Sequence, residues 1–324
     1  MCTAISYRRN DHYFGRTLDV EFTFNEKVII TPRNYPFKTM KGISYQNKYA
    51  IIGSGIELNG IPFYYEGANE KGLAIAGLNF PGNVQFNDPI ENKDNLLISE
   101  IIPWTLSHAS NLDEAKKFFE NMNVIANPDP KINATNSLHF MLSDSTGSFV
   151  AEASSDHFMI YDNPFDVMTN NPPFPYHLWN MNHYLNLSPK NEENRFTDKF
   201  SLTNDGVGMG AYGLPGDTSS TSRFVRAAFN LANSVNEDTE EANISQFFHV
   251  LDSVSMVKGC TLTPAGKNDI TLYSCCINTD KGIFYYKTYD NNQINAVKLN
   301  NVDLASDHLY IYELSGPQNI NFRN

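Results

Sequence analysis

The sequence predicts an α+β fold in which antiparallel sheets carry pairs of helices on their outer faces. Two observations lead to this class: β-type runs occupy both ends and the centre of the chain, and two helix pairs interrupt them. This order differs from the regular strand–helix alternation of a doubly wound parallel sheet. The 324 residues contain no internal repeat and no low-complexity linker, so residues 1–324 are expected to form one domain.

The first 90 residues are predicted to form short strands separated by turns. The runs lie at Thr3–Tyr7, His12–Arg16, Val28–Thr31, Tyr49–Gly55 and Gly72–Leu78. Asn-Asp, Pro-Arg-Asn and Asn-Gly sequences punctuate them, as turns between strands require. The first two runs are expected to pair as a hairpin, in which the second strand returns towards the start of the first.

Apolar residues at helical spacing predict two pairs of helices further along the chain. The predicted helices are Leu96–His108, a second from Ser110 through Met122, Ser222–Ser234 and Ile244–Met256. The second begins with Ser110 and Asp113 at the spacing of a capping box. The strands predicted between and after the pairs are Ser137–Ser143, Ser148–Ala153, Phe158–Tyr161, Ile270–Cys276, Gly282–Tyr289 and Gln293–Leu299.

The composition excludes several classes of function. A net charge of -12 argues against a nucleic-acid partner, since phosphates require basic patches. No signal peptide and no run of about 18 apolar residues is found, so we expect a cytoplasmic protein without a membrane partner. Four cysteines are too few for a disulfide framework at this length. The eight histidines lack zinc-site spacing and no dinucleotide motif follows a strand, so neither metal nor cofactor is expected.

Cys2 is the residue that could carry chemistry, because it directly follows Met1. Removal of Met1 would leave a thiol and a free α-amine on one residue, and the amine can take the proton of the thiol. The predicted hairpin would bring Arg16 and Asp19 beside this terminus. A cation favours the thiolate, and a carboxylate orients the amine. From the spacing alone, an ordinary surface ion pair at a hairpin end is the commoner arrangement.

Eight short motifs strengthen the first interpretation by occurring in a fixed order. They are Met1-Cys2-Thr3-Ala4, Phe14-Gly15-Arg16-x-Leu18-Asp19, Asn69-Glu70-Lys71-Gly72-Leu73, Ala76-Gly77-Leu78-Asn79-Phe80, Thr169-Asn170-Asn171-Pro172, Gly213-Leu214-Pro215-Gly216-Asp217, Ser222-Arg223-Phe224 and Tyr285-Tyr286-x-Thr288-Tyr289. Together they resemble the choloylglycine hydrolase family, which contains conjugated bile salt hydrolases and penicillin V acylases. The resemblance runs from Cys2 to about Ala296. Singly, Asn170 could cap a turn before proline and Arg223 could be solvated.

The resemblance implies an N-terminal-nucleophile hydrolase with a four-layer αββα core, active after Met1 removal and usually a homotetramer. It implies no metal and no cofactor. The resemblance also implies a role for each matching residue. Cys2 would be the nucleophile and the base, with Arg16 and Asp19 as its charge partners. Arg223 would complete the polar network, and Asn79 and Asn170 would donate hydrogen bonds to the oxyanion. Side-chain amides suit the last role because they donate hydrogen bonds without adding charge. Thr17 departs from the family, which more often has Asn there.

The substrate implied is a conjugated bile salt, because Asn79 is similar to the bile salt hydrolases whereas penicillin V acylases tend to carry Tyr. Leu18, Phe22, Tyr64 and Tyr65 lie in segments that border the site in relatives. They could supply an apolar groove for a rigid steroid, or they could be core residues. Penicillin V or acyl-homoserine lactones are the alternative substrates. A ligand-binding relative without activity is a second alternative, against which the intact set of polar residues argues.

Overall fold

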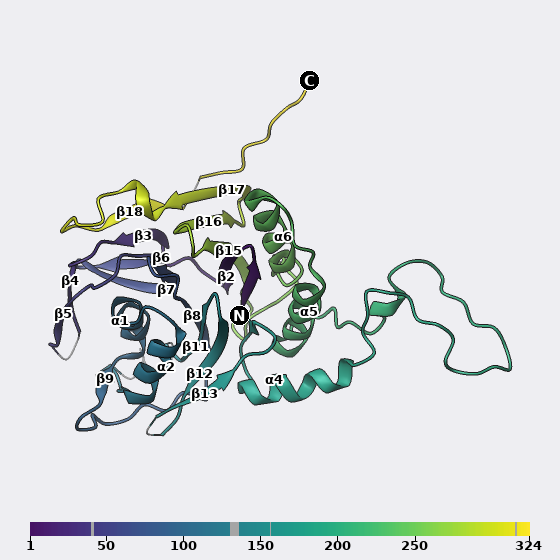
Figure 1. Ribbon diagram of the computed structural model, residues 1–324, viewed down its shortest axis with the longest axis horizontal. Helices are drawn as coiled ribbons and strands as arrows, with labels where there is room; N and C mark the ends of the chain where they lie inside the picture. The colour runs from purple at the N-terminus through teal and green to yellow at the C-terminus, as the bar shows by residue number, and fades with distance from the viewer. Residues whose placement is uncertain (40–41, 130–135, 156, 315) are drawn as a thin grey trace.

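The computed structural model describes residues 1–39, 42–129, 136–155, 157–314 and 316–324, and these form two large antiparallel sheets that face each other. Two helices cover the outer face of one sheet and two cover the other (Figure 1). The four helices are α1 (Ile101–His108), α2 (Leu112–Asn121), α5 (Ser220–Asn233) and α6 (Glu240–Asp252). The predicted four-layer αββα arrangement is therefore confirmed.

The first sheet has α5 and α6 on its outer face and contains both strands of the predicted N-terminal hairpin. Its strand order is β14 (Val167–Met168), β1 (Cys2–Arg9), β2 (Asp11–Val20), β15 (Ile270–Asn278), β16 (Ile283–Thr288) and β17 (Asn291–Lys298). Asn10 joins β1 to β2 with a positive φ of 54°, a conformation that Asn tolerates better than most residues. The hairpin register pairs Cys2 with Leu18 and Ala4 with Arg16.

The second sheet has α1 and α2 on its outer face. Its strand order is β13 (Phe158–Asp162), β12 (Gly147–Ala153), β11 (Leu138–Asp144), β8 (Ala74–Asn79), β7 (Ile61–Asn69), β6 (Ile51–Leu58), β3 (Lys27–Thr31) and β18 (Tyr310–Glu313). The sequence did not predict β7, where Pro62 lies one residue after the strand begins. It also did not predict the edge strand β18. Short pairs β4 (Pro36–Lys38) with β5 (Ser44–Gln46) and β9 (Asp94–Leu96) with β10 (Met122–Val124) lie outside the two sheets.

The helices begin at different residues from those predicted. Leu96 belongs to β9, and α1 starts only after the 3-10 turn Ile98–Glu100. The capping box at Ser110 was wrong: Asn111 is the N-cap of α2, and its side chain accepts from the Glu114 backbone N–H. The Ser110 hydroxyl instead donates to the Glu114 carboxylate. In the second pair, α5 agrees with the prediction to within two residues, whereas α6 begins four residues earlier than Ile244.

Between α4 (Phe174–Asn180), which was not predicted, and α5 the chain leaves the layered body and forms a long arm (Figure 1). The 3-10 turns Met181–Tyr184 and Met209–Ala211 lie in this stretch, and Leu299–Asn301 forms another after β17. The arm exposes several large apolar side chains, namely Phe196, Phe200, Leu202, Val207 and Tyr212. None of the helices in the described ranges has the length and apolar character that a membrane crossing demands.

Candidate active site

Cys2 lies at the first position of β1 and is only 2% exposed. Residues paired across a hairpin share a face of the sheet, so the register puts Cys2 on the same face as Arg16, towards the second sheet. There Arg16 Nη2 donates a hydrogen bond to Cys2 Sγ. Arg16 also donates from Nη1 to the Gly77 carbonyl oxygen of β8, at 2.8 Å. A guanidinium held against a buried thiol favours the thiolate.

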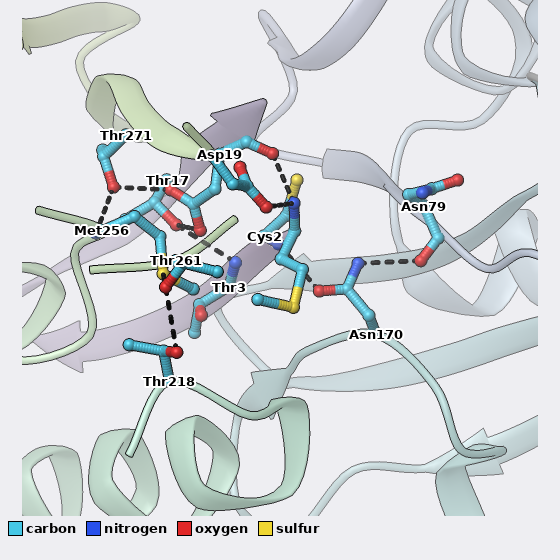
Figure 2. Close-up of polar contacts among 12 residues, drawn as sticks. Cys2, Thr3, Thr17, Asp19, Asn79, Asn170, Thr218, Met256, Thr261 and Thr271 are labelled. Atoms are coloured by element: carbon cyan, nitrogen blue, oxygen red, sulfur yellow. Dashed lines mark hydrogen bonds and ion pairs between the residues drawn. The ribbon is translucent and has the colours of Figure 1, made fainter. Parts of the chain in front are cut away.

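Asp19 lies near the terminus, but on the opposite face of the hairpin. Its carboxylate accepts from Thr271 Oγ1 at 2.6 Å and from Thr17 Oγ1 at 2.9 Å (Figure 2). Burial raises the pKa of Asp19, although the N-terminal ammonium and Arg223 counteract this. The ammonium of Met1 donates to the Asp19 carbonyl oxygen. Asp19 therefore contacts the N-terminus through its backbone, while its carboxylate interacts with the same ammonium by charge.

Asn170 connects the start of β1 with β8 and α5. Its Oδ1 accepts from the Cys2 backbone N–H at 2.7 Å and from Arg223 Nη2 at 2.8 Å. Its Nδ2 donates to the Asn79 carbonyl oxygen at 2.7 Å (Figure 2). The Asn170 backbone N–H donates to Ser220 Oγ at 2.9 Å. All polar atoms of this side chain therefore have partners within the site.

Two buried histidines, which the sequence analysis missed, hold the loop that carries Asn170. His177 Nε2 lies 3.0 Å from the Asn170 carbonyl oxygen, and His139 Nε2 lies 2.8 Å from that of Thr169. Because a carbonyl only accepts, both nitrogens must donate. Burial lowers the pKa of His177 to about 4, so its ring is neutral at neutral pH. Isolated histidines at these positions carry no sequence signal for such a role.

Arg223, in the first turn of α5, is completely buried and reaches Cys2 from the outer face of the hairpin. Its Nη1 donates to the Cys2 carbonyl oxygen and, at 2.6 Å, to Thr3 Oγ1. Burial lowers the pKa of Arg223, and the Coulombic effects of Asp19 and Cys2 act in the opposite direction. The structure therefore brings Arg16 and Arg223 to Cys2 from opposite sides of one hairpin.

The remaining predicted residues take different positions. Asn79 ends β8 with an exposed side chain, and it is the backbone carbonyl that contacts Asn170. Leu18 is buried as the cross-strand partner of Cys2. Tyr64 packs on the other face of its sheet, among the residues beneath α1 and α2, and its hydroxyl contacts Thr31 Oγ1 at 2.6 Å. Tyr64 thus points away from Cys2.

Phe22 and Tyr65 belong to a small aromatic cluster at the end of β2. Phe24 joins them, with ring centroids 4.7 Å from Phe22 and 5.7 Å from Tyr65. Phe22 and Phe24 are 51% and 41% exposed, so this cluster offers an apolar surface to solvent. Phe22 and Phe24 follow Asp19 by a few residues, just after the strand that carries Arg16, whereas Tyr65 comes from β7 and is the neighbour of Glu66.

The geometry places a buried thiol at the second residue of an αββα fold, with the Arg16 guanidinium against its sulfur and one side-chain amide, that of Asn170, on its backbone N–H. All four cysteines lie within the described ranges and are free, and of these Cys260 is exposed. With Met1 removed, a buried thiol paired with a guanidinium at the start of the chain would have the arrangement of an N-terminal-nucleophile hydrolase.

Comparison with known proteins gives the family. The model described as linear amide C–N hydrolases, choloylglycine hydrolase family, matches residues 2–312. The bile salt hydrolase/transferase of Lactiplantibacillus plantarum is 44% identical over 97% of this chain and 97% of its own length. The structure of the C2A mutant of the conjugated bile acid hydrolase from Clostridium perfringens has a TM-score of 0.93 at 36% identity, with 100% of both chains covered. The chain therefore belongs to the choloylglycine hydrolase family.

A more distant likeness concerns the fold alone. Penicillin V acylase from Agrobacterium tumefaciens has a TM-score of 0.77 at 21% identity, covering 97% of this chain and 92% of its own. Family membership confirms the resemblance predicted from the eight motifs and the class of enzyme, a hydrolase of linear amide C–N bonds.

Proposed function

We propose that this protein hydrolyses the amide bond of glycine- or taurine-conjugated bile salts and releases the free bile acid and the amino acid. The observation that carries the proposal is the buried contact between Arg16 Nη2 and Cys2 Sγ at the start of β1. The substrate class is supported by relatives that match nearly the whole chain and are named bile salt hydrolases. One domain over residues 1–324 would carry the activity.

Removal of Met1 is the first step in the proposed mechanism. It converts the Cys2 nitrogen, which donates to Asn170 Oδ1 at 2.7 Å, into a free α-amine. The amine takes the thiol proton, and the thiolate beside Arg16 attacks the substrate carbonyl. The resulting ammonium then protonates the leaving amine, which departs and leaves a thioester on Cys2. Water hydrolyses the thioester, with the α-amine as the base, and the thiol is regenerated.

Asn170 and Asn79 are proposed to stabilise the tetrahedral oxyanion. Asn170 Nδ2 is fixed within the site by the Oδ1 contacts of the same amide to Cys2 and Arg223. Nδ2 now donates to the Asn79 carbonyl oxygen, and the oxyanion would take over or share this donor. The carbonyl itself can only accept, so the donor proposed for Asn79 is its side-chain amide at the exposed end of β8. A donor of this kind typically contributes about 2.7–4 kcal/mol to the transition state.

The apolar body of the substrate is proposed to lie against Leu18 and the cluster of Phe22, Phe24 and Tyr65. Exposed aromatic rings beside a polar site suit a rigid amphipathic molecule, because the rings bury apolar area without large loss of side-chain entropy. Tyr64 is left out of this surface because its ring packs beneath α1 and α2.

We further propose a cytoplasmic homotetramer that acts without a nucleic-acid or membrane partner. The arm between α4 and α5 supports assembly, because it projects from the body and exposes large apolar residues such as Phe196, Val207 and Tyr212, which are 79–100% exposed. Apolar surface of this kind commonly marks a protein–protein contact. Replacement of Phe196 and Tyr212 by Ser is expected to lower the mass measured by light scattering from a tetramer to a smaller species.

The function is tested by intact mass spectrometry combined with product release from glycocholate, taurocholate and penicillin V. We expect loss of one methionine, release of glycine or taurine, and no activity in the Cys2→Ala variant. Cleavage of penicillin V alone would leave the mechanism in place and overturn the substrate. A folded, trimmed protein that cleaves none of the three would contradict bile salt hydrolysis and favour a ligand-binding protein.

A further inference from the structure

A buried carboxylate lies behind Arg16 and has no role in the mechanism above. Glu66, on β7 of the second sheet, is 0% exposed, and its Oε2 lies 3.7 Å from Arg16 Nη1. The other terminal nitrogen of the same guanidinium donates to Cys2 Sγ. One cation therefore lies between two acids, the carboxylate of one sheet and the thiol of the other.

The position of Glu66 is fixed by neighbours other than Arg16. The Tyr273 hydroxyl lies 2.9 Å from both carboxylate oxygens, and it accepts in turn from Ser54 Oγ at 3.0 Å. The buried Cys275 side chain also favours the ionised carboxylate and acts to lower the pKa of Glu66. Arg16 keeps its own second anchor at the Gly77 carbonyl oxygen. Loss of the Glu66 charge would therefore leave the guanidinium in place and change chiefly the electrostatics.

Burial of this pair makes its charges interdependent. A buried carboxylate is costly unless a cation compensates it, and the same holds for a buried guanidinium. Burial raises the pKa of Glu66 to about 7, although Arg16 and the Tyr273 hydroxyl counteract it. Burial also disfavours the charged form of Arg16, but the Coulombic effects of Cys2 and Glu66 outweigh this and raise its pKa. The titratable groups that face Glu66 are Arg16 from β2, Tyr273 and Cys275 from β15, Tyr65 from β7 and Glu26 from the turn before β3.

We propose that Glu66 is a positioning residue that shares the Arg16 guanidinium with the Cys2 thiol, so that the charge on Glu66 limits how strongly Arg16 favours the thiolate. When Glu66 is ionised, part of the Arg16 field is compensated by the carboxylate. When Glu66 is neutral, the whole positive charge acts on the thiol. The carboxylate and the thiol therefore compete for one cation. The inference rests on Cys2 as the reactive thiol of the proposed function, but not on the identity of the substrate.

The test is the pH dependence of Cys2 alkylation by iodoacetamide in the full-length protein without Met1, between pH 5 and 9. The mass of the N-terminal peptide reports modification of Cys2, and the exposed Cys260 serves as an internal reference. In Glu66→Gln we expect the Cys2 profile to move to lower pH, with alkylation about three- to tenfold faster at pH 8, where Glu66 of the wild type is ionised, while Cys260 is unchanged. Superimposable Cys2 profiles in folded wild type and Glu66→Gln, or a shift to higher pH, would overturn the proposal.

Three further variants separate charge from structure. Glu66→Asp retains the charge and is expected to keep the wild-type profile. Tyr273→Phe removes the hydroxyl that stabilises the carboxylate, so a smaller shift in the direction of Glu66→Gln is expected, and this variant decides the question if Glu66→Gln does not fold. Asp144→Asn alters another buried carboxylate, which accepts from the Leu112 backbone N–H at the start of α2, and should leave the Cys2 profile unchanged.

The outcome is distinct from that of the bile salt assay. A shifted Cys2 profile in a protein that cleaves no bile salt would support the role of Glu66 and overturn only the proposed substrate. Bile salt hydrolysis with an unshifted profile would support the substrate and overturn the role of Glu66.

Discussion

Replacement of Asn170 by Ala should reduce kcat far more than it raises KM. The variant removes Nδ2, the proposed oxyanion donor, and a single donor of this kind is worth about 2.7–4 kcal/mol, or about 10²- to 10³-fold in kcat. It also removes Oδ1, which accepts from the Cys2 backbone N–H and from Arg223 Nη2. Each buried donor left unpaired costs about 1–3 kcal/mol, so the free energy of unfolding should fall by about 2–6 kcal/mol before water enters the space.

Asn170→Asp separates these two effects. It keeps the acceptor for Cys2 and Arg223 but puts an oxygen where Nδ2 donates to the Asn79 carbonyl oxygen. We therefore expect a loss in kcat comparable to that of Asn170→Ala, with a melting temperature nearer to wild type. The assay is release of glycine from glycocholate at saturating and limiting substrate, with thermal unfolding measured in parallel. If both variants keep kcat within tenfold of wild type, the side chain of Asn170 does not stabilise the oxyanion.

Three further predictions concern the frame and the groove. Gly15→Ala should abolish cooperative thermal unfolding, because a Cβ would lie 2.0 Å from the Cys275 carbonyl oxygen. A variant that unfolds at the wild-type melting temperature would contradict the close approach of β2 and β15 at this residue. Burial lowers the pKa of His12 to about 3, so as the pH falls His12 is protonated in the unfolded chain before it is protonated in the folded chain. The free energy of unfolding should then fall by up to about 1.4 kcal/mol per pH unit between pH 6.5 and about 3, and urea titrations should show a shallower decline in His12→Gln. Phe24→Ala should raise KM for glycocholate about five- to twentyfold, whereas Tyr64→Phe should leave KM unchanged. Equal effects of the two variants on KM would contradict the placement of Phe24 and Tyr64 on different sides of the sheet.

The hairpin that builds the site could be predicted because its determinants are local. Alternating side chains and one Asn-Asp turn are enough to predict that β1 and β2 pair, and the register then follows and sets Arg16 on the face of Cys2. The motifs around Asn170 and Arg223 depended on resemblance instead. Nothing local indicates that a residue at the start of α5 will reach the backbone of residue 2.

Contacts between the two sheets could not be predicted. Glu66 lies in β7, which Pro62 obscured, and its partner Arg16 belongs to a strand of the other sheet. Alternation along one strand gives the face of a residue but not which strand lies opposite in the next layer. The same limit explains Tyr64, which was grouped with Tyr65 although adjacent residues of a strand point to opposite faces.

The charges around Cys2 bear on the α-amine that the proposed removal of Met1 would create. Arg16 and Arg223 bring two buried cations, and Asp19 and Glu66 bring two buried carboxyl groups, one on each face of the hairpin. A thiolate formed by loss of a proton to solvent would add an uncompensated charge to this interior, which is costly. Transfer of the proton from Sγ to the α-amine of the same residue leaves the net charge unchanged. In the proposed mechanism the ammonium formed on the same residue also stays beside the thiolate, so the two new charges compensate each other at short range, which a distant base would not provide.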